Sequence, residues 1–261
     1  MPHISPDADA FRPCIVIPVF NHGGAIAGVI DRLRSFGLPC WLIDDGSSAD
    51  CATILDALAG AESSWVHLER LPLNQGKGAA FRHGLACAEQ AGFNHVLQID
   101  ADGQHDPADL PKLLEQSRLH PEAVVTGVPI YDDSVPRLRL YGRYLTHVWV
   151  WINTASLQIQ DSMCGFRLYP VPSTSQLMRQ CRIGNRMEFD TDIIVHAYWD
   201  GAQIISVPTR VRYPEDGVSH FRMLRDNARI SFMHARLFVI MLWRRMGLGP
   251  AIKPWTSTGK N

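Results

Sequence analysis

Short apolar runs rich in β-branched residues recur along the chain and alternate with longer stretches in which apolar residues return at helical spacing. The clearest runs lie at 14–17, 41–43, 96–99, 124–127 and 204–207, with a weaker one at 65–68. Short apolar runs bounded by turn-forming residues are typical of buried strands. Their alternation with helical segments and short links predicts an α/β fold with a mostly parallel sheet flanked by helices.

The segments between these runs predict helices. The predicted helices cover 26–36, 48–58, 77–92, 107–117, 193–199 and 226–246, and a basic stretch that begins at 137 leads into another. In open sheets of parallel strands, ligands bind beyond the carboxyl ends of the strands. The residues that directly follow each strand are therefore the first candidates for function.

Polar residues gather at these strand ends. Asn21 follows the first run, Asp45 the second, and Lys77 lies in the glycine-rich turn that follows the third, while Asp100 and Asp102 follow the fourth. The Gly-Lys-Gly core of the turn matches neither the P-loop nor the dinucleotide-binding fingerprint, which disfavours those classes. Lys77 also fits an exposed residue in the first turn of a helix.

Asp100 and Asp102 stand one residue apart where a buried run ends. Alternate residues of an extended chain point the same way, so both carboxylates can project together beyond the sheet. Two adjacent carboxylates repel each other unless a cation joins them, and Mg²⁺ or Mn²⁺ accepts such ligands together with phosphate oxygens. Gln104 offers a neutral oxygen nearby. A solvated turn fits the same residues, because Asp, Gly and the Asp106-Pro107 pair are all turn formers.

Length and composition fit one sizeable α/β domain with appendages, since 46% of the 261 residues are hydrophobic and a chain of this length buries a large core. The formal net charge is −1, so no overall field attracts nucleic acid. The six cysteines, at 14, 40, 51, 87, 164 and 181, form no CxxC pair and are expected to be reduced core residues of a cytoplasmic protein. We expect no secretory signal in the polar residues 1–12.

Two segments combine arginines with apolar or aromatic residues. Three arginines alternate with leucines, tyrosines and tryptophans in 137–152, and an apolar run at 237–243 leads into Arg244-Arg245. Such segments suit a membrane interface or an amphiphilic acceptor, although a core-packing helix with a solvated basic end fits 137–152 equally well. The apolar run at 237–243 is far shorter than the roughly 20 residues that span a bilayer. We therefore expect peripheral attachment to the inner, cytoplasmic face of a membrane.

Further charged residues in the second half of the chain have catalytic potential. Asp161, Glu188 or Asp190 can deprotonate a hydroxyl acceptor as a general base. Acids at the start of a helix also complement its dipole, and for Asp192 we favour that interpretation.

A phosphate acceptor would need different residues. A phosphate monoester, with a second pKa of about 6, is mostly dianionic at neutral pH and needs cationic positioning more than a base. Arg143, Arg167 and His220 are the candidates for that role.

Five motifs, taken in order, resemble those of the family-2 inverting glycosyltransferases, in particular the dolichyl-phosphate mannose synthase branch. They are Pro18-Val19-Phe20-Asn21, Asp44-Asp45-Gly46-Ser47, Asn74-Gln75-Gly76-Lys77-Gly78, Asp100-Ala101-Asp102-Gly103-Gln104 and Cys164-Gly165-Phe166-Arg167. The resemblance covers roughly residues 13–222 and implies an A-type glycosyltransferase fold with a Rossmann-like sheet that binds a nucleotide-diphosphate sugar. His22 stands where many relatives carry Glu, which leaves the choice between uracil and guanine open.

The resemblance also implies roles on the nucleotide side of the site. Pro18 and Asn21 lie in the nucleotide-binding loop, Asp45 faces the base and Lys77 lies near the nucleotide. Asp100 lies by the ribose and the metal.

The metal and the sugar side follow in the same way. The resemblance implies that Asp102 ligates the metal and that Gln104 assists it. It places Arg167 and residues 188–190 on the acceptor and donor-sugar side.

These observations predict an enzyme that moves a sugar from a nucleotide-diphosphate sugar to a lipid-linked acceptor, such as a polyprenyl phosphate, by metal-assisted inverting displacement. A cation held by Asp102 would neutralise the leaving diphosphate. Glycosylation of a lipid hydroxyl is the alternative, followed by a nucleotidyltransferase or a non-catalytic sugar-nucleotide sensor. The predicted organisation is a tail at 1–12, a glycosyltransferase domain at 13–222, and an amphipathic helix and tail at 223–261.

Overall fold

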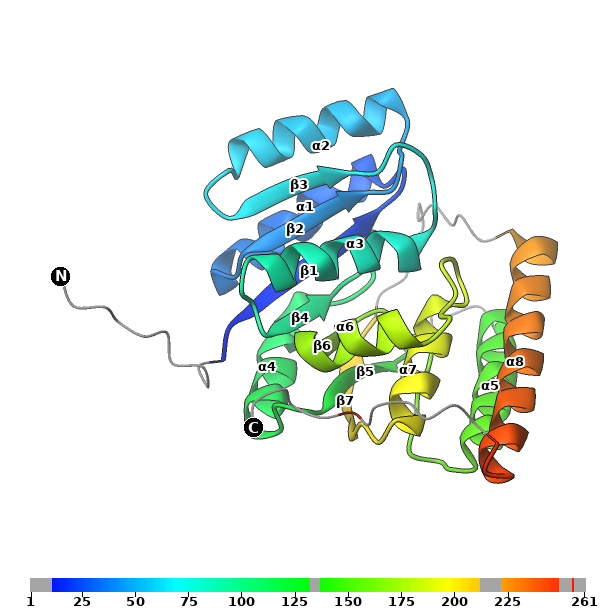
Figure 1. Cartoon of the computed structure of the whole chain (residues 1–261). Coiled ribbons are helices and arrows are strands. Elements are labelled where there is room, and N and C mark those ends of the chain that lie inside the picture. Colours follow the sequence, from blue (N-terminus) through cyan, green and yellow to red (C-terminus); the bar gives the residue numbers. More distant parts are fainter. Residues whose placement is uncertain (1–10, 132–136, 212–221, 249–254, 256–261) are drawn as a thin grey trace.

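The computed structural model describes residues 11–131, 137–211, 222–248 and 255, and within them seven strands form one sheet (Figure 1). The strand order is β3-β2-β1-β4-β6-β5-β7. The strands are β1 (Pro13–Val19), β2 (Cys40–Asp44), β3 (Val66–Arg70), β4 (His95–Gln98), β5 (Val124–Ile130), β6 (Arg167–Pro170) and β7 (Ile204–Arg210). Only β6 runs antiparallel to its neighbours in this sheet, which confirms the predicted mostly parallel α/β architecture.

Helices cover both faces of the sheet. They are α1 (Gly23–Leu33), α2 (Ala49–Ala61), α3 (Lys77–Gln90), α4 (Leu110–Leu119), α5 (Arg137–Thr154), α6 (Val171–Gln180), α7 (Phe189–Trp199) and α8 (Met223–Arg245), with 3-10 turns at Arg34–Phe36 and Pro107–Asp109. Buried residues of α1, α2 and α4 pack on one face, and those of α3, α6 and α7 on the other. Strand residues divide between the two faces by simple alternation, so both faces of the central strands are apolar.

Two features of the sheet differ from the sequence prediction. β1 continues through Pro18, where the pattern predicts its end. Beyond Val16 this strand pairs only with β2, and proline is tolerated where one edge of a strand is open. β6 was not predicted, because its four residues begin with Arg167 and end with Pro170, which leaves too short an apolar run to indicate a strand.

Helices α5 and α8 lie side by side at one end of the molecule (Figure 1). Val150 of α5 shares a buried cluster with Ile194 and Val195 of α7 and with Met233 and Leu237 of α8. The inner faces of both arginine-containing segments therefore pack against the body of the protein. Within the described parts of the chain, none of the helices has the length and apolar character needed to cross a bilayer. The six cysteines are free thiols, as predicted.

Candidate active site

One lysine joins two carboxylates at the strand ends. Lys77, the first residue of α3, places its Nζ 2.6 Å from Asp100 Oδ1 and 2.6 Å from Asp190 Oδ2. Asp100 follows β4, whereas Asp190 comes from the first turn of α7. Burial favours the neutral amine, but the two carboxylates outweigh it and raise the pKa of Lys77. Lys77 therefore stays an ammonium at the centre of the site.

The acidic pair of the fourth strand end is electrostatically unequal. Burial opposes ionisation of Asp100, but Lys77 and His105 outweigh it and hold the pKa of Asp100 well below its usual range. Burial raises the pKa of Asp102, and the charge of Asp100 adds to this effect. Asp102 Oδ1 accepts a hydrogen bond from the Gln104 backbone N–H at 3.0 Å. Asp102 is thus the carboxylate whose negative charge the protein itself compensates least.

His105 also belongs to this site, although we assigned it no role from the sequence. Its Nε2 lies 3.7 Å from Asp100 Oδ2, and its ring stacks on Phe166 with a centroid separation of 5.4 Å. Gly165 packs directly against the Asp100 carboxylate, where a Cβ would overlap its oxygens. A glycine is therefore required at this position of the Cys164–Arg167 motif, because the backbone approaches a protein carboxylate.

Asp45 holds the glycine-rich turn in place. Its Oδ1 accepts from the Gln75 N–H at 2.8 Å, and its Oδ2 accepts from the Gly76 N–H at 2.7 Å and from Asn74 Nδ2 at 2.9 Å. Burial raises the pKa of Asp45, and these backbone bonds partly offset the effect. Arg186, which we did not single out from the sequence, donates from Nη1 to Asn74 Oδ1 at 2.6 Å. Asp45 therefore positions the turn that presents Lys77.

Asn21 links the loops that follow the first two strands. Its backbone N–H donates to Ser47 Oγ at 3.0 Å, and its Oδ1 accepts from the Ser48 N–H at 2.8 Å. Its φ of 55° lies in the left-handed region, which Asn tolerates better than most residues. Pro18 lies in β1 just before this loop. The structure thus brings Pro18 and Asn21 to the same edge of the sheet as Asp45.

Arg167 lies beneath the site and is fully buried. Its Nε donates to Thr126 Oγ1 at 3.0 Å, and its Nη2 donates to the Ser162 carbonyl at 3.3 Å. Its Nη1 donates to Tyr169 Oη at 3.1 Å and to the Asp190 carbonyl at 2.8 Å. The expectation that Arg167 contacts the acceptor is therefore wrong, because each guanidinium nitrogen is bonded inside the protein. Arg167 instead supports the start of α7.

Arg143 and Asp161 form a buried bidentate ion pair. Arg143 Nε and Nη2 donate to the two oxygens of Asp161 at 2.7 and 2.6 Å, and the N–H groups of Met163 and Cys164 donate to Asp161 Oδ1 at 2.8 Å each. Burial opposes the ionisation of Asp161, but the contacts with His147 and Arg143 outweigh burial and hold the pKa of Asp161 well below its usual range. This pairing makes Asp161 a poor general base, which corrects that expectation. Arg143 holds Asp161 through Nε and Nη2, and its role toward an acceptor stays a prediction.

The acids around the start of α7 have distinct surroundings. Glu188 is half-buried next to Gly184, and its Oε1 accepts from the Arg186 N–H at 3.3 Å. Asp192 lies in the first turn of α7, where it can complement the helix dipole. It is also fully buried and pairs with Arg236 of α8. His220 lies outside the described residues.

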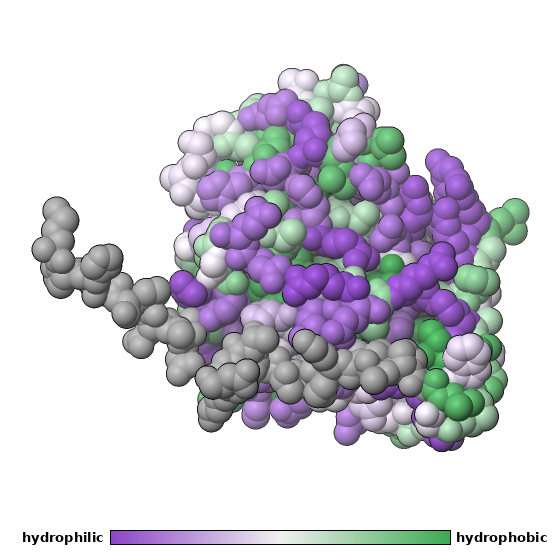
Figure 2. Space-filling model, viewed as in Figure 1, coloured by the Kyte–Doolittle hydropathy of each residue, from purple (hydrophilic) through white to green (hydrophobic). Residues whose placement is uncertain are grey.

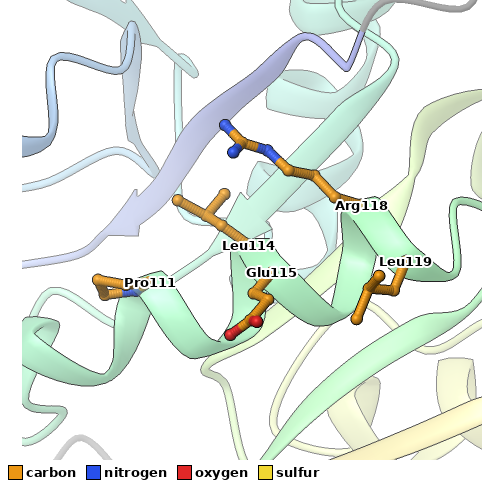
Figure 3. A pocket seen from close by; sticks show the side chains of 5 residues that line it. All are labelled: Pro111, Leu114, Glu115, Arg118 and Leu119. Atoms are coloured by element: carbon orange, nitrogen blue, oxygen red, sulfur yellow. The ribbon is translucent and has the colours of Figure 1, made fainter.

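Two cavities are lined by described residues of the chain. One, of about 320 Å³, lies on the outer face of α4 and is lined by Pro111, Leu114, Glu115, Arg118 and Leu119 (Figure 3). It includes no candidate site residue. The other, of about 260 Å³, lies between the loop before α7 and α8, with Glu188, Arg229 and Arg236 in its wall. Lys77, Asp100 and Asp190 line neither of these two cavities.

Comparison with known proteins gives a family match. Residues 14–180 match the family described as glycosyl transferase family 2. The chain is 31% identical to the undecaprenyl-phosphate mannosyltransferase of Micrococcus luteus, over 76% of this chain and 82% of that protein. It is 25% identical to the polyprenol monophosphomannose synthase of Mycolicibacterium smegmatis, over 84% of this chain and 83% of that protein.

Solved structures share the fold. Glucosyl-3-phosphoglycerate synthase from Mycobacterium tuberculosis superposes with a TM-score of 0.62 and 18% identity, covering 94% of this chain and 83% of its own. A mannosyltransferase from Pyrobaculum calidifontis, solved in complex with GDP-Man and Mn²⁺, superposes with a TM-score of 0.55 and 15% identity, covering 95% of this chain and 68% of its own. These similarities confirm the A-type glycosyltransferase fold.

Proposed function

Because this chain belongs to glycosyl transferase family 2 and is a glycosyltransferase, we propose that it transfers a sugar from a nucleotide-diphosphate donor to the phosphate of a polyprenyl-type lipid, with inversion at the anomeric carbon. The observation that carries this proposal is the strand-end cluster in which Lys77 is held between Asp100 and Asp190, with Asp102 alongside. The cluster provides a cation and a cation-binding carboxylate for a diphosphate.

The donor lies along the ends of β1, β2 and β4 in this proposal. Pro18 and Asn21 form one wall, and the turn held by Asp45 presents Lys77 to the nucleotide. Asp100 lies between this wall and the metal position. Charged donors fixed in place before the reaction stabilise a developing diphosphate charge without reorganisation, which is the largest contribution to catalysis in such sites.

The residues at the end of β4 fit a divalent cation, Mg²⁺ or Mn²⁺. Burial and the charge of Asp100 raise the pKa of Asp102, so a cation would relieve an unfavourable accumulation of negative charge. Within the described residues, no group of three or more His, Cys, Asp or Glu side chains is placed to hold a metal alone. Asp102, with Asp100 and Gln104 beside it, would share the ion with diphosphate oxygens. The ion would supply charge neutralisation to the leaving group.

The acceptor is assigned by chemistry. The relatives are named for lipid phosphates, and a phosphate oxygen is already ionised, so the reaction needs no strong base. The low pKa of Asp161 makes it a poor general base. Asp190 is bonded at both oxygens, whereas Glu188 has one bond among the described residues, from the Arg186 N–H at 3.3 Å. Glu188 is therefore the acid available to a hydroxyl acceptor, which is the second candidate.

A lipid acceptor also requires access to a membrane surface, for which we propose the outer face of α5 and α8. Exposed apolar side chains on this face are Tyr141, Tyr144, Leu145, Trp149, Ile152, Phe232, Val239, Leu242 and Trp243. Figure 2 shows hydrophobic residues gathered at the lower right, where these helices lie in Figure 1. Arg225 and Arg245 are exposed on α8 and can meet anionic lipid. Attachment to the inner face of a membrane follows as part of the proposal.

Transfer is tested with the full chain, a panel of nucleotide-diphosphate sugars and polyprenyl phosphate in detergent, with and without Mn²⁺. The expected product is a sugar phosphate labile to mild acid, and nucleotide diphosphate is released in step with it. Asp102→Asn should lower turnover by about 100-fold or more while the protein stays folded, since it removes the charge that holds the cation. An acid-stable product made from a polyprenol would instead establish hydroxyl glycosylation, and equal turnover in a strong chelator would contradict the metal role.

Membrane attachment is tested by flotation with anionic and neutral vesicles at low and high salt. Binding to anionic vesicles should weaken with salt and with Trp243→Ser on α8. Leu119→Ser is the matched control, because Leu119 is similarly exposed but lies on α4. Absence of flotation at low ionic strength would show that this face contacts something other than lipid.

A further inference from the structure

Gln98 is a polar residue placed where the core pattern calls for an apolar one. It is the last residue of β4, and its side chain is fully buried. Its Nε2 donates to Asp190 Oδ1 at 2.7 Å. The buried amide therefore has a hydrogen-bond partner, which is a carboxylate of the candidate active site.

The carboxylate of Asp190 is held at both oxygens. Gln98 bonds to Oδ1, and Lys77 Nζ lies 2.6 Å from Oδ2. The same lysine lies 2.6 Å from Asp100 Oδ1. Without the Gln98 donor, Asp190 would be free to rotate and offer both oxygens to Lys77, which would shift the ammonium relative to Asp100.

Neighbouring strand residues fix which end of the Gln98 amide faces Asp190. Tyr169 Oη donates to Gln98 Oε1 at 3.5 Å, which leaves the NH₂ end for the carboxylate. Arg167, paired with Gln98 in the β4–β6 register, holds the Asp190 carbonyl at 2.8 Å. Side chain and backbone of Asp190 are thus both bonded from the β4–β6 strand pair.

We propose that Gln98 is a positioning residue of the glycosyl transfer reaction, which orients the Asp190 carboxylate and so keeps Lys77 between Asp190 and Asp100. This inference rests on the proposed function. Gln98 does not face the substrate, so its effect passes through Asp190. In metal sites, loss of the outer hydrogen-bond partner of a ligand lowers metal affinity or activity by about 10- to 100-fold, and we expect an effect of this order for the Asp190 carboxylate.

The first test uses Gln98→Met, which removes the amide and nearly preserves the volume. We expect kcat to fall by about 10- to 100-fold, with little change in the KM for the donor and little loss of thermal stability. Gln98→Glu should be at least as impaired, because it places a second carboxylate against Asp190. Gln116→Met on α4 makes the same chemical change away from Asp190 and should leave kcat unchanged.

A double-mutant cycle separates this role from a merely structural one. If Gln98 acts through Asp190, Gln98→Met should lower kcat little further in an Asp190→Asn background. Full additivity of the two effects, or a wild-type kcat in Gln98→Met, would overturn the inference. If the wild-type protein transfers no sugar from any donor, the proposed function fails instead.

A crystal structure of Gln98→Met then decides the inference without reference to activity. The Asp190 carboxylate should be rotated, with both oxygens toward Lys77. An unchanged carboxylate would overturn the positioning role.

Discussion

Replacement of Lys77 by Met removes the one charge that joins Asp100 to Asp190 while keeping most of the side-chain stem. Both carboxylates are largely enclosed, with side-chain exposures of 26% and 9%. Lys77→Met should therefore destabilise the protein in the absence of a divalent cation, because two adjacent acids lose the ammonium that lies 2.6 Å from each.

The expected loss can be bounded from the contacts that remain. Removing one partner of a buried ion pair costs about 3–5 kcal/mol. Asp190 keeps its bond to Gln98, and Asp100 is partly solvated and keeps only the longer contact to His105. We therefore expect the free energy of unfolding to fall by about 3 kcal/mol, the lower end of this range.

Mn²⁺ should restore part of this loss. A ligand present at 100 times its Kd stabilises a protein by about 2.7 kcal/mol, and in the variant no ammonium competes with the cation for Asp100. Urea unfolding followed by tryptophan fluorescence and far-UV circular dichroism, at a series of Mn²⁺ concentrations, measures both effects.

Lys112→Met is the matched control for this experiment. Lys112 Nζ lies 2.5 Å from Asp109 Oδ1, and the Lys112 side chain is 59% exposed although that of Asp109 is 6% exposed. Asp109 keeps the bond from the Arg210 N–H at 2.7 Å, so we expect the loss of this solvated lysine to cost about 1 kcal/mol. The reasoning would be refuted if Lys77→Met lost no more stability than Lys112→Met, or if Mn²⁺ stabilised both variants equally.

Two further predictions concern buried acids away from the strand ends. Arg143→Met should lower the free energy of unfolding, measured by urea titration, by about 3–5 kcal/mol, because it leaves the buried Asp161 carboxylate without its partner. Adding Asp161→Asn should recover part of this loss. Strict additivity of the two effects would contradict the pairing. Burial raises the pKa of Asp200 to about 6, against the opposing charge of Arg244, so protonation favours the folded state. Relative to Asp200→Asn, the wild type should lose stability as pH rises from about 4 to about 6; parallel stability–pH curves would count against this environment.

The strands and the acids at their ends could be predicted from sequence, because both depend on neighbouring residues. The residues of an apolar β-branched run by themselves indicate a buried strand, and Asp100 and Asp102 follow such a run directly. Strand β6 was not predicted, because its burial is not a local property. It depends on strands β4 and β5 on either side, and the short segment from Arg167 to Pro170 carries no clear apolar pattern of its own.

The roles of individual charges were less predictable. Arg143, Asp161 and Arg167 all carry chemistry suited to an acceptor site, and residue type alone does not reveal that these groups bond within the protein. Asp192 lies in the first turn of α7, as the sequence indicates, but its ion-pair partner Arg236 lies 44 positions away and could not be predicted. A buried charge must find a partner, and which partner it finds is set by packing between elements.

The sequence by itself therefore determined the α/β class, the family resemblance and the strand ends at which the donor is expected, since these follow from local pattern and motif. Only the tertiary structure decided which charges are free and which are paired. Asp190 meets Gln98 across 92 positions and Lys77 across 113, and no local pattern records such pairs. Their geometry arises because the sheet brings the end of β4 and the starts of α3 and α7 together, where burial makes each unpaired charge too costly to leave alone.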